Sequence, residues 1–184
     1  MLQNKNKVDE YTGNWITTYI GKKFHFLEPS EDEIDIRDIA HALALTCRFG
    51  GHCSKFYSVA QHSVLVSWQV SEKNMLAGLM HDAHEAYLHD VPRPIKARIA
   101  GYADIANNLQ NKIQLKYKYT ITNEDEIKWA DDTLLSTEKR DLLTNTEDWK
   151  ELPTPLEHKI YCWSPKYSEE KFLEVFKYLM DKNE

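Results

Sequence analysis

The chain has 184 residues, 42% hydrophobic and 28% charged, which is long enough to bury a sizeable core, and we expect one domain over residues 1–184. Its net charge of −6 argues against a protein that binds long nucleic acids, because such proteins carry a basic face. No apolar run is as long as a membrane span, and residues 1–7 lack the features of a signal peptide. We therefore expect a cytoplasmic protein with no membrane partner.

Cysteine usage points to the same compartment. The three cysteines, Cys47, Cys53 and Cys162, include no Cys-x-x-Cys pair. An odd number without that spacing predicts reduced thiols and indicates neither a disulfide framework nor a zinc ribbon.

The N-terminal part of the chain predicts a strand pair followed by a helix. Residues 11–29 are rich in β-branched and aromatic residues, with glycine and proline between them, which favours a short strand pair or an ordered loop. A helix should follow, beginning at the capping-type Ser30, or else at Asp35 or Asp38. It should end near Arg48, because the two glycines that follow favour a chain reversal. Its expected buried stripe is Ile36, Ile39, Ala40, Leu43 and Ala44.

The remaining elements are also predicted to be helical. Ser58 should cap a helix over residues 58–70 that keeps His62 on its buried side. The next helix is expected from residue 74 to about 89, where a segment with two prolines ends it. Further amphipathic helices are expected over residues 103–119, 123–143 and 168–180, with a loop over 144–166. These elements predict an all-α fold, a single helical bundle.

Four residues on these helices could bind a metal ion together: His62, His81, Asp82 and Asp131. Each has apolar neighbours on its face of the helix, and partly buried polar groups are costly unless they are paired or metal-bound. Two imidazoles and two carboxylates suit Mn²⁺, Fe²⁺, Co²⁺, Ni²⁺ or Zn²⁺. Taken alone, His62 is more simply an internal histidine bonded to a backbone carbonyl, and a structural protein whose His and Asp residues only bridge helices stays an alternative.

The neighbours of this group add the means for acid–base chemistry. Glu85 lies four residues after His81 and three after Asp82, so it shares their helical face and could act as a general base or acid. Asp132 directly follows Asp131, but successive helical residues point about 100° apart, so only one of them should face the metal. The basic residues Arg48, Arg93, Lys96 and Lys128 could form a local pocket for a small anion, or could be solvated surface residues.

At several segments the sequence resembles the HD-domain metal-dependent phosphohydrolases, and more closely the branch with bacterial 5'-deoxynucleotidases and phage dATP triphosphohydrolases. The resemblance covers roughly residues 15–143, in the family's order. The matching segments are residues 35–43, 47–52, 57–63, 80–96 and 127–131. The chain departs from the family pattern at His89, where glycine is common, so we expect the turn before Asp90 to be held differently.

The resemblance implies an HD-type helical fold whose catalytic segments span about residues 48–131. It implies that one divalent metal ion (Mn, Co, Zn, Fe or Ni) is bound by His62, His81, Asp82 and Asp131. It further implies that Glu85 and Asp90 form the acid–base pair. Arg48, Lys96 and Lys128 would hold phosphate, with Phe49 and Pro94 near the sugar and base.

These implications lead to an expected function, the hydrolysis of small 5'-deoxynucleotides. Three cations exceed what one phosphate requires, which favours a deoxynucleoside triphosphate triphosphohydrolase, with dATP preferred, that releases deoxynucleoside and triphosphate. A 5'-deoxynucleotidase that acts on monophosphates is the near alternative, and a nucleotide-binding sensor without turnover is an alternative of another class. Hydrolysis of an alarmone or a cyclic nucleotide fits the matching segments less well. HD relatives are frequently oligomeric, which keeps a homo-oligomer open.

Overall fold

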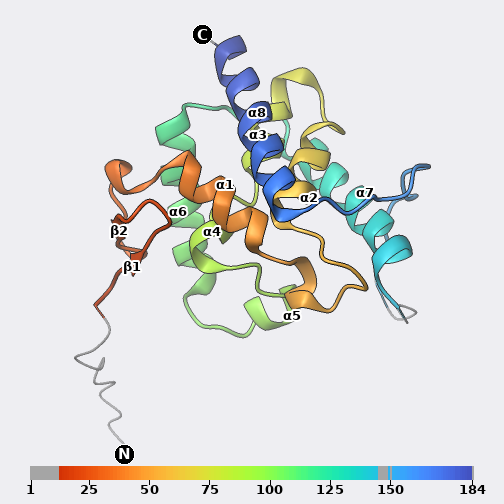
Figure 1. Cartoon of the computed structure of the whole chain (residues 1–184), viewed down its shortest axis with the longest axis horizontal. Helices are drawn as coiled ribbons and strands as arrows, with labels where there is room; N and C mark the ends of the chain where they lie inside the picture. Colours follow the sequence, from red (N-terminus) through yellow and green to blue (C-terminus); the bar gives the residue numbers. More distant parts are fainter. Residues whose placement is uncertain (1–12, 145–148, 150, 184) are drawn as a thin grey trace, which may run out of the picture.

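The computed structural model describes residues 13–144, 149 and 151–183. Within these ranges the chain is essentially helical, apart from one two-stranded hairpin, so the predicted all-α class is confirmed (Figure 1). The elements are β1 (Ile16–Thr17), β2 (Lys23–Phe24), α1 (Ile36–Leu45), α2 (Val59–Ser67), α3 (Met75–Met80), α4 (Glu85–Leu88), α5 (Arg93–Lys96), α6 (Tyr102–Tyr117), α7 (Glu124–Leu142) and α8 (Pro165–Asn183). No helix in the described ranges combines the length and hydropathy needed to cross a bilayer.

The N-terminal elements follow the predicted pattern with shifted boundaries. β1 and β2 pair antiparallel, and Tyr11 and Thr12, the first residues of the predicted strand region, lie outside the described residues. The first of the expected helix starts becomes only a 3-10 turn over Glu31–Glu33. The helix itself begins after Asp35, whose side chain accepts a hydrogen bond from the Arg37 N–H at 3.0 Å. A side-chain cap therefore decides between the alternative starts.

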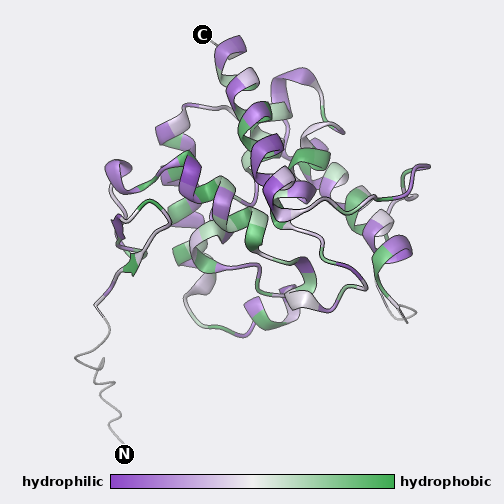
Figure 2. Ribbon diagram, viewed as in Figure 1, coloured by the Kyte–Doolittle hydropathy of each residue, from purple (hydrophilic) through white to green (hydrophobic). Residues whose placement is uncertain are grey.

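Helix α2 is the centre of the bundle. It contacts α1, α3, α7 and α8, and almost every residue along it is buried. The polar side chains of a helix that is buried on all sides must find hydrogen-bond or metal partners inside the protein. His62 lies on this helix, so its partners must be other groups of the interior. Gly78 on α3 allows close packing here, since a Cβ at that position would lie 3.2 Å from the Ser67 Cα. In Figure 2, hydrophobic and hydrophilic residues alternate along α1 and α8, as expected for helices buried on one face.

The helix predicted over residues 74–89 is divided into α3 and α4, which corrects the expectation of one continuous helix. Between them the backbone tightens into turns with i to i+3 hydrogen bonds: the Ala83 N–H donates to Met80 and the Glu85 N–H donates to Asp82. In such a 3-10 geometry, side chains three residues apart lie in line. Asp82 and Glu85 are thereby directed to the same side of the turn.

In the C-terminal half of the chain, α7 packs against α2. The Asn123 side chain caps α7 by accepting from the Glu126 N–H, as the sequence predicted. The wholly buried Asn74 at the start of α3 accepts from the Thr122 N–H at 2.9 Å, which fixes where α7 begins. Residues 151–164 form neither helix nor strand, in agreement with the predicted loop, of which 145–148 and 150 lie outside the described residues.

Candidate metal centre

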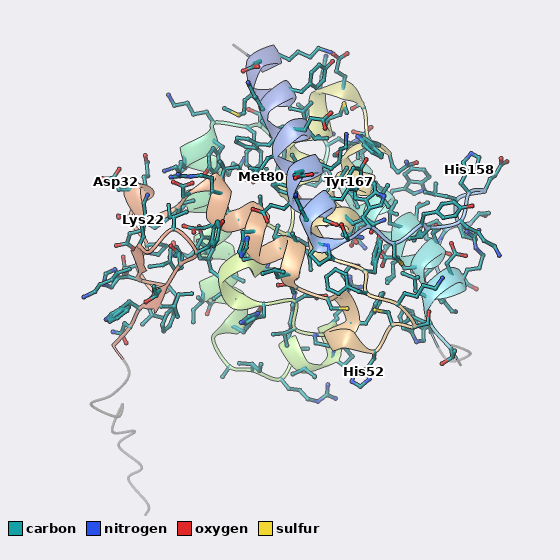
Figure 3. The ribbon with its side chains drawn as sticks, viewed as in Figure 1. Lys22, Asp32, His52, Met80, His158 and Tyr167 are labelled. Atoms are coloured by element: carbon teal, nitrogen blue, oxygen red, sulfur yellow. The ribbon has the colours of Figure 1, made fainter. Side chains whose placement is uncertain are left out.

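Three of the four predicted metal ligands converge in the middle of the bundle. His62 comes from α2, His81 from the turn that ends α3, and Asp131 from α7. One ligand atom from each lies within 4.8 Å of the others. Figure 3 labels Met80, the residue that precedes His81 in the chain and ends α3. The buried His62 and the half-buried His81 and Asp131 form a group that could hold a metal ion.

The orientation of the two imidazole rings fits a bound metal. Nδ1 of His62 contacts Glu138 Oε1 at 2.6 Å, and Nδ1 of His81 contacts the Gly78 carbonyl at 2.8 Å. Both Nε2 atoms are buried and lack a hydrogen-bond partner of acceptable geometry in the described part of the chain. Metal-ligating histidines typically bond through one ring nitrogen to an acceptor and present the other to the metal. The two Nε2 atoms each lie 3.1 Å from a carboxylate oxygen, of Asp131 and Asp82, and together these groups suit a divalent ion.

Asp82, the fourth predicted ligand, lies beside this group. Its Oδ2 is 3.1 Å from Nε2 of His81, 3.9 Å from Nε2 of His62 and 3.8 Å from Nη1 of Arg48. Burial raises the pKa of Asp82, but the two histidines and Arg48 outweigh burial and hold it well below its usual range. Asp82 is thus kept as a carboxylate, the form that binds metals.

The pKa values of His81 and Asp131 in the metal-free protein show which proton must leave when a metal binds. Burial lowers the pKa of His81, but the Asp82 carboxylate raises it more, to about 9. The pKa of Asp131 is lowered, because its contact with His62 outweighs burial. A metal requires the neutral imidazole, so its binding must release a proton from His81.

Glu138 is a buried member of the site that sequence reasoning missed. It is fully buried on α7 and its Oε2 accepts from Arg48 at 3.1 Å and 3.2 Å, while its Oε1 faces Nδ1 of His62. One carboxylate therefore orients both a candidate metal ligand and a candidate phosphate ligand. The signal was present in the sequence, because Glu138 follows Asp131 by seven residues, or two helical turns, and so shares its face.

A pocket of about 710 Å³ opens beside the metal-ligand group. The predicted site residues that line it are Arg48, Phe49, Asp82, Glu85, Asp90, Pro94, Lys96 and Asp131. Its other walls include Arg93, noted from sequence only as a basic neighbour, and Trp149, which no sequence argument selected. The Phe49 and Trp149 rings lie 6.4 Å apart, so the pocket has an aromatic side as well as a cationic one.

Lys128 stands apart from this pocket. It is not among the pocket's lining residues, and its Nζ donates to Asp132 Oδ2 at 2.8 Å one turn along α7. Its side chain is 64% exposed. A role for Lys128 in phosphate binding stays a prediction, and within the described residues Arg93 is the third cation that lines the pocket with Arg48 and Lys96.

Glu85 is paired with Lys96 inside the pocket. Lys96 Nζ donates to Glu85 Oε1 at 2.6 Å, while Glu85 is only 2% exposed. Burial, followed by the carboxylates of Asp82 and Asp90, raises the pKa of Glu85 to about 8, against the opposing effect of Lys96. A carboxyl group with a pKa near neutrality is suited to donate or accept a proton.

Comparison with known proteins shows the family to which this chain belongs. No family model matches the chain. It is 42% identical over 129 residues to the uncharacterized protein YfdR of Escherichia coli K12, an alignment that covers 70% of the chain and 72% of YfdR. The chain belongs to the YfdR family. It is also 35% identical over 113 residues to an uncharacterized protein of Rhodobacter capsulatus, over 56% of the chain and 58% of that protein. Any function for this YfdR-family chain must therefore be argued from its own site.

The raised pKa of Glu85 predicts a pH-dependent change in stability for this YfdR-family protein. The pKa rises from 4.5 in the unfolded chain to about 8 in the folded protein, so the contribution of Glu85 to the stability of the metal-free wild type should fall as pH increases between these values. The Glu85→Gln variant cannot ionise and should avoid that loss. We expect it to be more stable than wild type by roughly 1–3 kcal/mol at about pH 8, after relaxation around the charge is allowed for.

Thermal unfolding of both proteins in chelator, from about pH 5 to about pH 8, measures this difference. The advantage of the variant should shrink toward the acid end, where the wild-type carboxyl keeps its proton in the folded state and loses it only partly in the unfolded one. An equal difference at both ends of the range would show that Glu85 does not titrate between them.

Proposed function

We propose that this protein is a metal-dependent phosphohydrolase of 5'-deoxynucleotides. The observation that carries the proposal is that three kinds of group lie in or directly beside one pocket, which Asp131 of the metal-ligand group lines. These are the potential metal ligands His62, His81 and Asp131, the buried Glu85, and the cations Arg48, Arg93 and Lys96. Phosphate ester hydrolysis needs an activated water, a proton carrier and compensation of negative charge, and each of these groups suits one of those needs.

A divalent ion held by His62, His81 and Asp131, with Asp82 beside them, would supply Lewis acidity, which lowers the pKa of water toward neutrality and polarises phosphate oxygens. The other steps fall to the side chains. The raised pKa of Glu85 suits this side chain to carry a proton to the leaving oxygen of the ester. Lys96, which contacts Glu85, can pair with a phosphate oxygen, and Asp90 offers a second carboxylate in the same pocket.

The dimensions and charges of the pocket favour a triphosphate substrate. Three cationic side chains line it, more than one phosphate group requires, and its volume of about 710 Å³ leaves room for a whole nucleotide. Phe49 and Trp149 offer aromatic surface to a base. Together with the family resemblance, these features favour dATP, cleaved to deoxyadenosine and triphosphate. Hydrolysis of deoxynucleoside monophosphates is the second candidate, favoured by the one His/Asp group that could hold a metal among the described residues.

A panel of deoxynucleoside mono- and triphosphates, with products separated by anion exchange, tests this function. The protein is stripped with chelator and then assayed with Mn²⁺, Co²⁺, Zn²⁺, Fe²⁺ or Ni²⁺ added singly. We expect release of triphosphate from dATP with at least one metal and no turnover in chelator. Inorganic phosphate from dAMP, with dATP left intact, would identify a monophosphatase.

Binding must be measured beside turnover, because a nucleotide sensor would keep the pocket without catalysis. Calorimetric titration of the metal-loaded protein with dATP provides this measurement. Binding without hydrolysis under any metal contradicts the enzymatic proposal and supports a sensor. If neither binding nor hydrolysis occurs, the group of His and Asp residues bridges helices only.

A further inference from the structure

Cys47 and Cys53 lie at the two ends of a short turn and face each other. Their Sγ atoms are 3.4 Å apart, and both side chains are half-buried. The backbone next to each is anchored, because the Arg48 N–H donates to the Tyr57 carbonyl and the Ser54 N–H donates to the Leu142 carbonyl. The sulfur pair is therefore held together by the fold, although its spacing in sequence suggested no pairing.

A second cavity gives small molecules a route to one of these thiols. It also has a volume of about 710 Å³ and is enclosed by the β1–β2 hairpin, α1 and the turn after α4. Cys47 lines it, and Cys53 is not among its lining residues. A small oxidant that enters this cavity can therefore meet Cys47 first, with Cys53 directly behind it.

The turn between the two cysteines separates the two cavities. Arg48, Phe49 and His52 line the pocket beside the metal-ligand group, whereas Gly50 and Gly51 line the second cavity. Figure 3 labels His52 on this turn, at the lower edge of the view. Phe49, Gly50 and Gly51 have φ angles of 58°, 59° and 82°, in the left-handed region. Glycine adopts this conformation freely, whereas Phe49 does so at a cost, so a change at the ends of the turn should move the Phe49 ring that lines the pocket.

From this arrangement we propose that Cys47 and Cys53 form a dithiol site that peroxides oxidise to an intramolecular disulfide, which alters the adjoining pocket. The Cys47 thiolate attacks one peroxide oxygen, the O–O bond breaks, and a sulfenic acid forms on Cys47 while one water leaves. The Cys53 sulfur then attacks the Cys47 sulfur, the S–O bond breaks and a second water leaves. Two thiols and one peroxide thus give one disulfide and two waters.

The order of attack follows from the surroundings of Cys53. Burial and then the contact with Cys47 raise the pKa of the Cys53 thiol to about 11. The Cys53 thiol also donates a hydrogen bond to the Arg48 carbonyl, at 3.7 Å. Cys53 therefore keeps its proton while Cys47 reacts with the peroxide. It gives up that proton in the second step, to the hydroxyl group that leaves the Cys47 sulfur as water. Because the sulfur atoms must approach each other to bond, both ends of the Arg48–His52 turn are drawn together.

Thiol titration of the full-length protein, before and after a few equivalents of hydrogen peroxide, tests the dithiol site. Of the three thiols per chain, we expect two to be lost, with a Cys47–Cys53 link found by peptide mass mapping. Cys162→Ser is the matched control and should lose both remaining thiols. Cys53→Ser should instead form a sulfenic acid on Cys47 that dimedone traps. A link to Cys162, or the persistence of all three thiols while methionines oxidise, overturns the proposal.

The effect on the pocket is measured separately, and this second part alone rests on the proposed function. After oxidation, the wild type should show a KM for its nucleotide that is raised several-fold and restored by dithiothreitol. In Cys53→Ser the disulfide cannot form, so peroxide without dithiothreitol should leave KM near its untreated value. A disulfide with an unaltered KM would disprove the coupling to the pocket, whereas an absence of turnover in the reduced protein would count against the proposed function itself.

Discussion

Asp131→Ala is expected to abolish metal binding and, with it, hydrolysis. Asp131 contributes the carboxylate of the buried group, with Oδ1 3.1 Å from Nε2 of His62, and no neighbouring residue on α7 can take its position. A metal ion contributes several kcal/mol to such reactions, so the rate should fall on the order of 10³-fold or more. The measurements are metal content after gel filtration and product release from the preferred deoxynucleotide.

Asp132→Ala is the matched control for this substitution. It removes a carboxylate from the next position of the same helix, where Asp132 accepts a hydrogen bond from Lys128. Because its direction differs from that of Asp131 by about 100°, metal content and turnover should stay near wild type. If both variants lost metal equally, the ligand would have been assigned to the wrong residue.

Glu138→Ala should cause the largest loss of stability. The Arg48 side chain, 9% exposed, would lose its nearest carboxylate. The remaining carboxylate within 4 Å of it among the described residues is Asp82, at 3.8 Å, and Nδ1 of His62 would lose its contact with Glu138. Breaking a buried ion pair costs about 3–5 kcal/mol, which corresponds to a fall in Tm of about 6–20 °C for a chain of this size. Metal affinity of the folded fraction should drop by about 10–100-fold, because His62 loses the contact that orients it.

Two comparisons separate this effect from a general loss of packing. The double variant Arg48→Met with Glu138→Leu removes both charges and should recover much of the stability but not the metal affinity. Glu169→Ala removes another His–Glu contact, that with His41 at 3.0 Å, where both side chains are about a quarter exposed. It should cost at most about 1 kcal/mol. An equal loss from Glu138→Ala and Glu169→Ala would refute a special role for Glu138.

The helical pattern could be predicted from the sequence because its signals are local. Asp35, Ser58 and Asn123 each cap the helix that follows, and their side chains accept backbone hydrogen bonds. The division of the predicted 74–89 helix could not be foreseen, since no glycine or proline marks it. Hydrogen bonds between backbone groups three residues apart create it, in the turn that carries His81 and Asp82.

The site was predictable only as far as its residues share a recognisable pattern. His62, His81 and Asp131 converge as the motif implied, but Glu138 carries no motif and gains its meaning from contacts with residues 76 and 90 positions away. Trp149 approaches Phe49 across the pocket for similarly nonlocal reasons. Lys128 pairs with Asp132 at the surface of α7. Helical periodicity does not determine which partner an exposed lysine contacts.

The turn before Asp90 limits the backbone conformations that the native protein can adopt there. His89 has φ 64° and ψ 157°, a conformation that glycine adopts freely and that costs other residues roughly 1–3 kcal/mol. Its carbonyl accepts from the Tyr102 hydroxyl at 3.2 Å, which helps to hold the turn. Histidine has far fewer alternative backbone states here than glycine, so the chain should sample fewer conformations just before Asp90, a residue that lines both cavities.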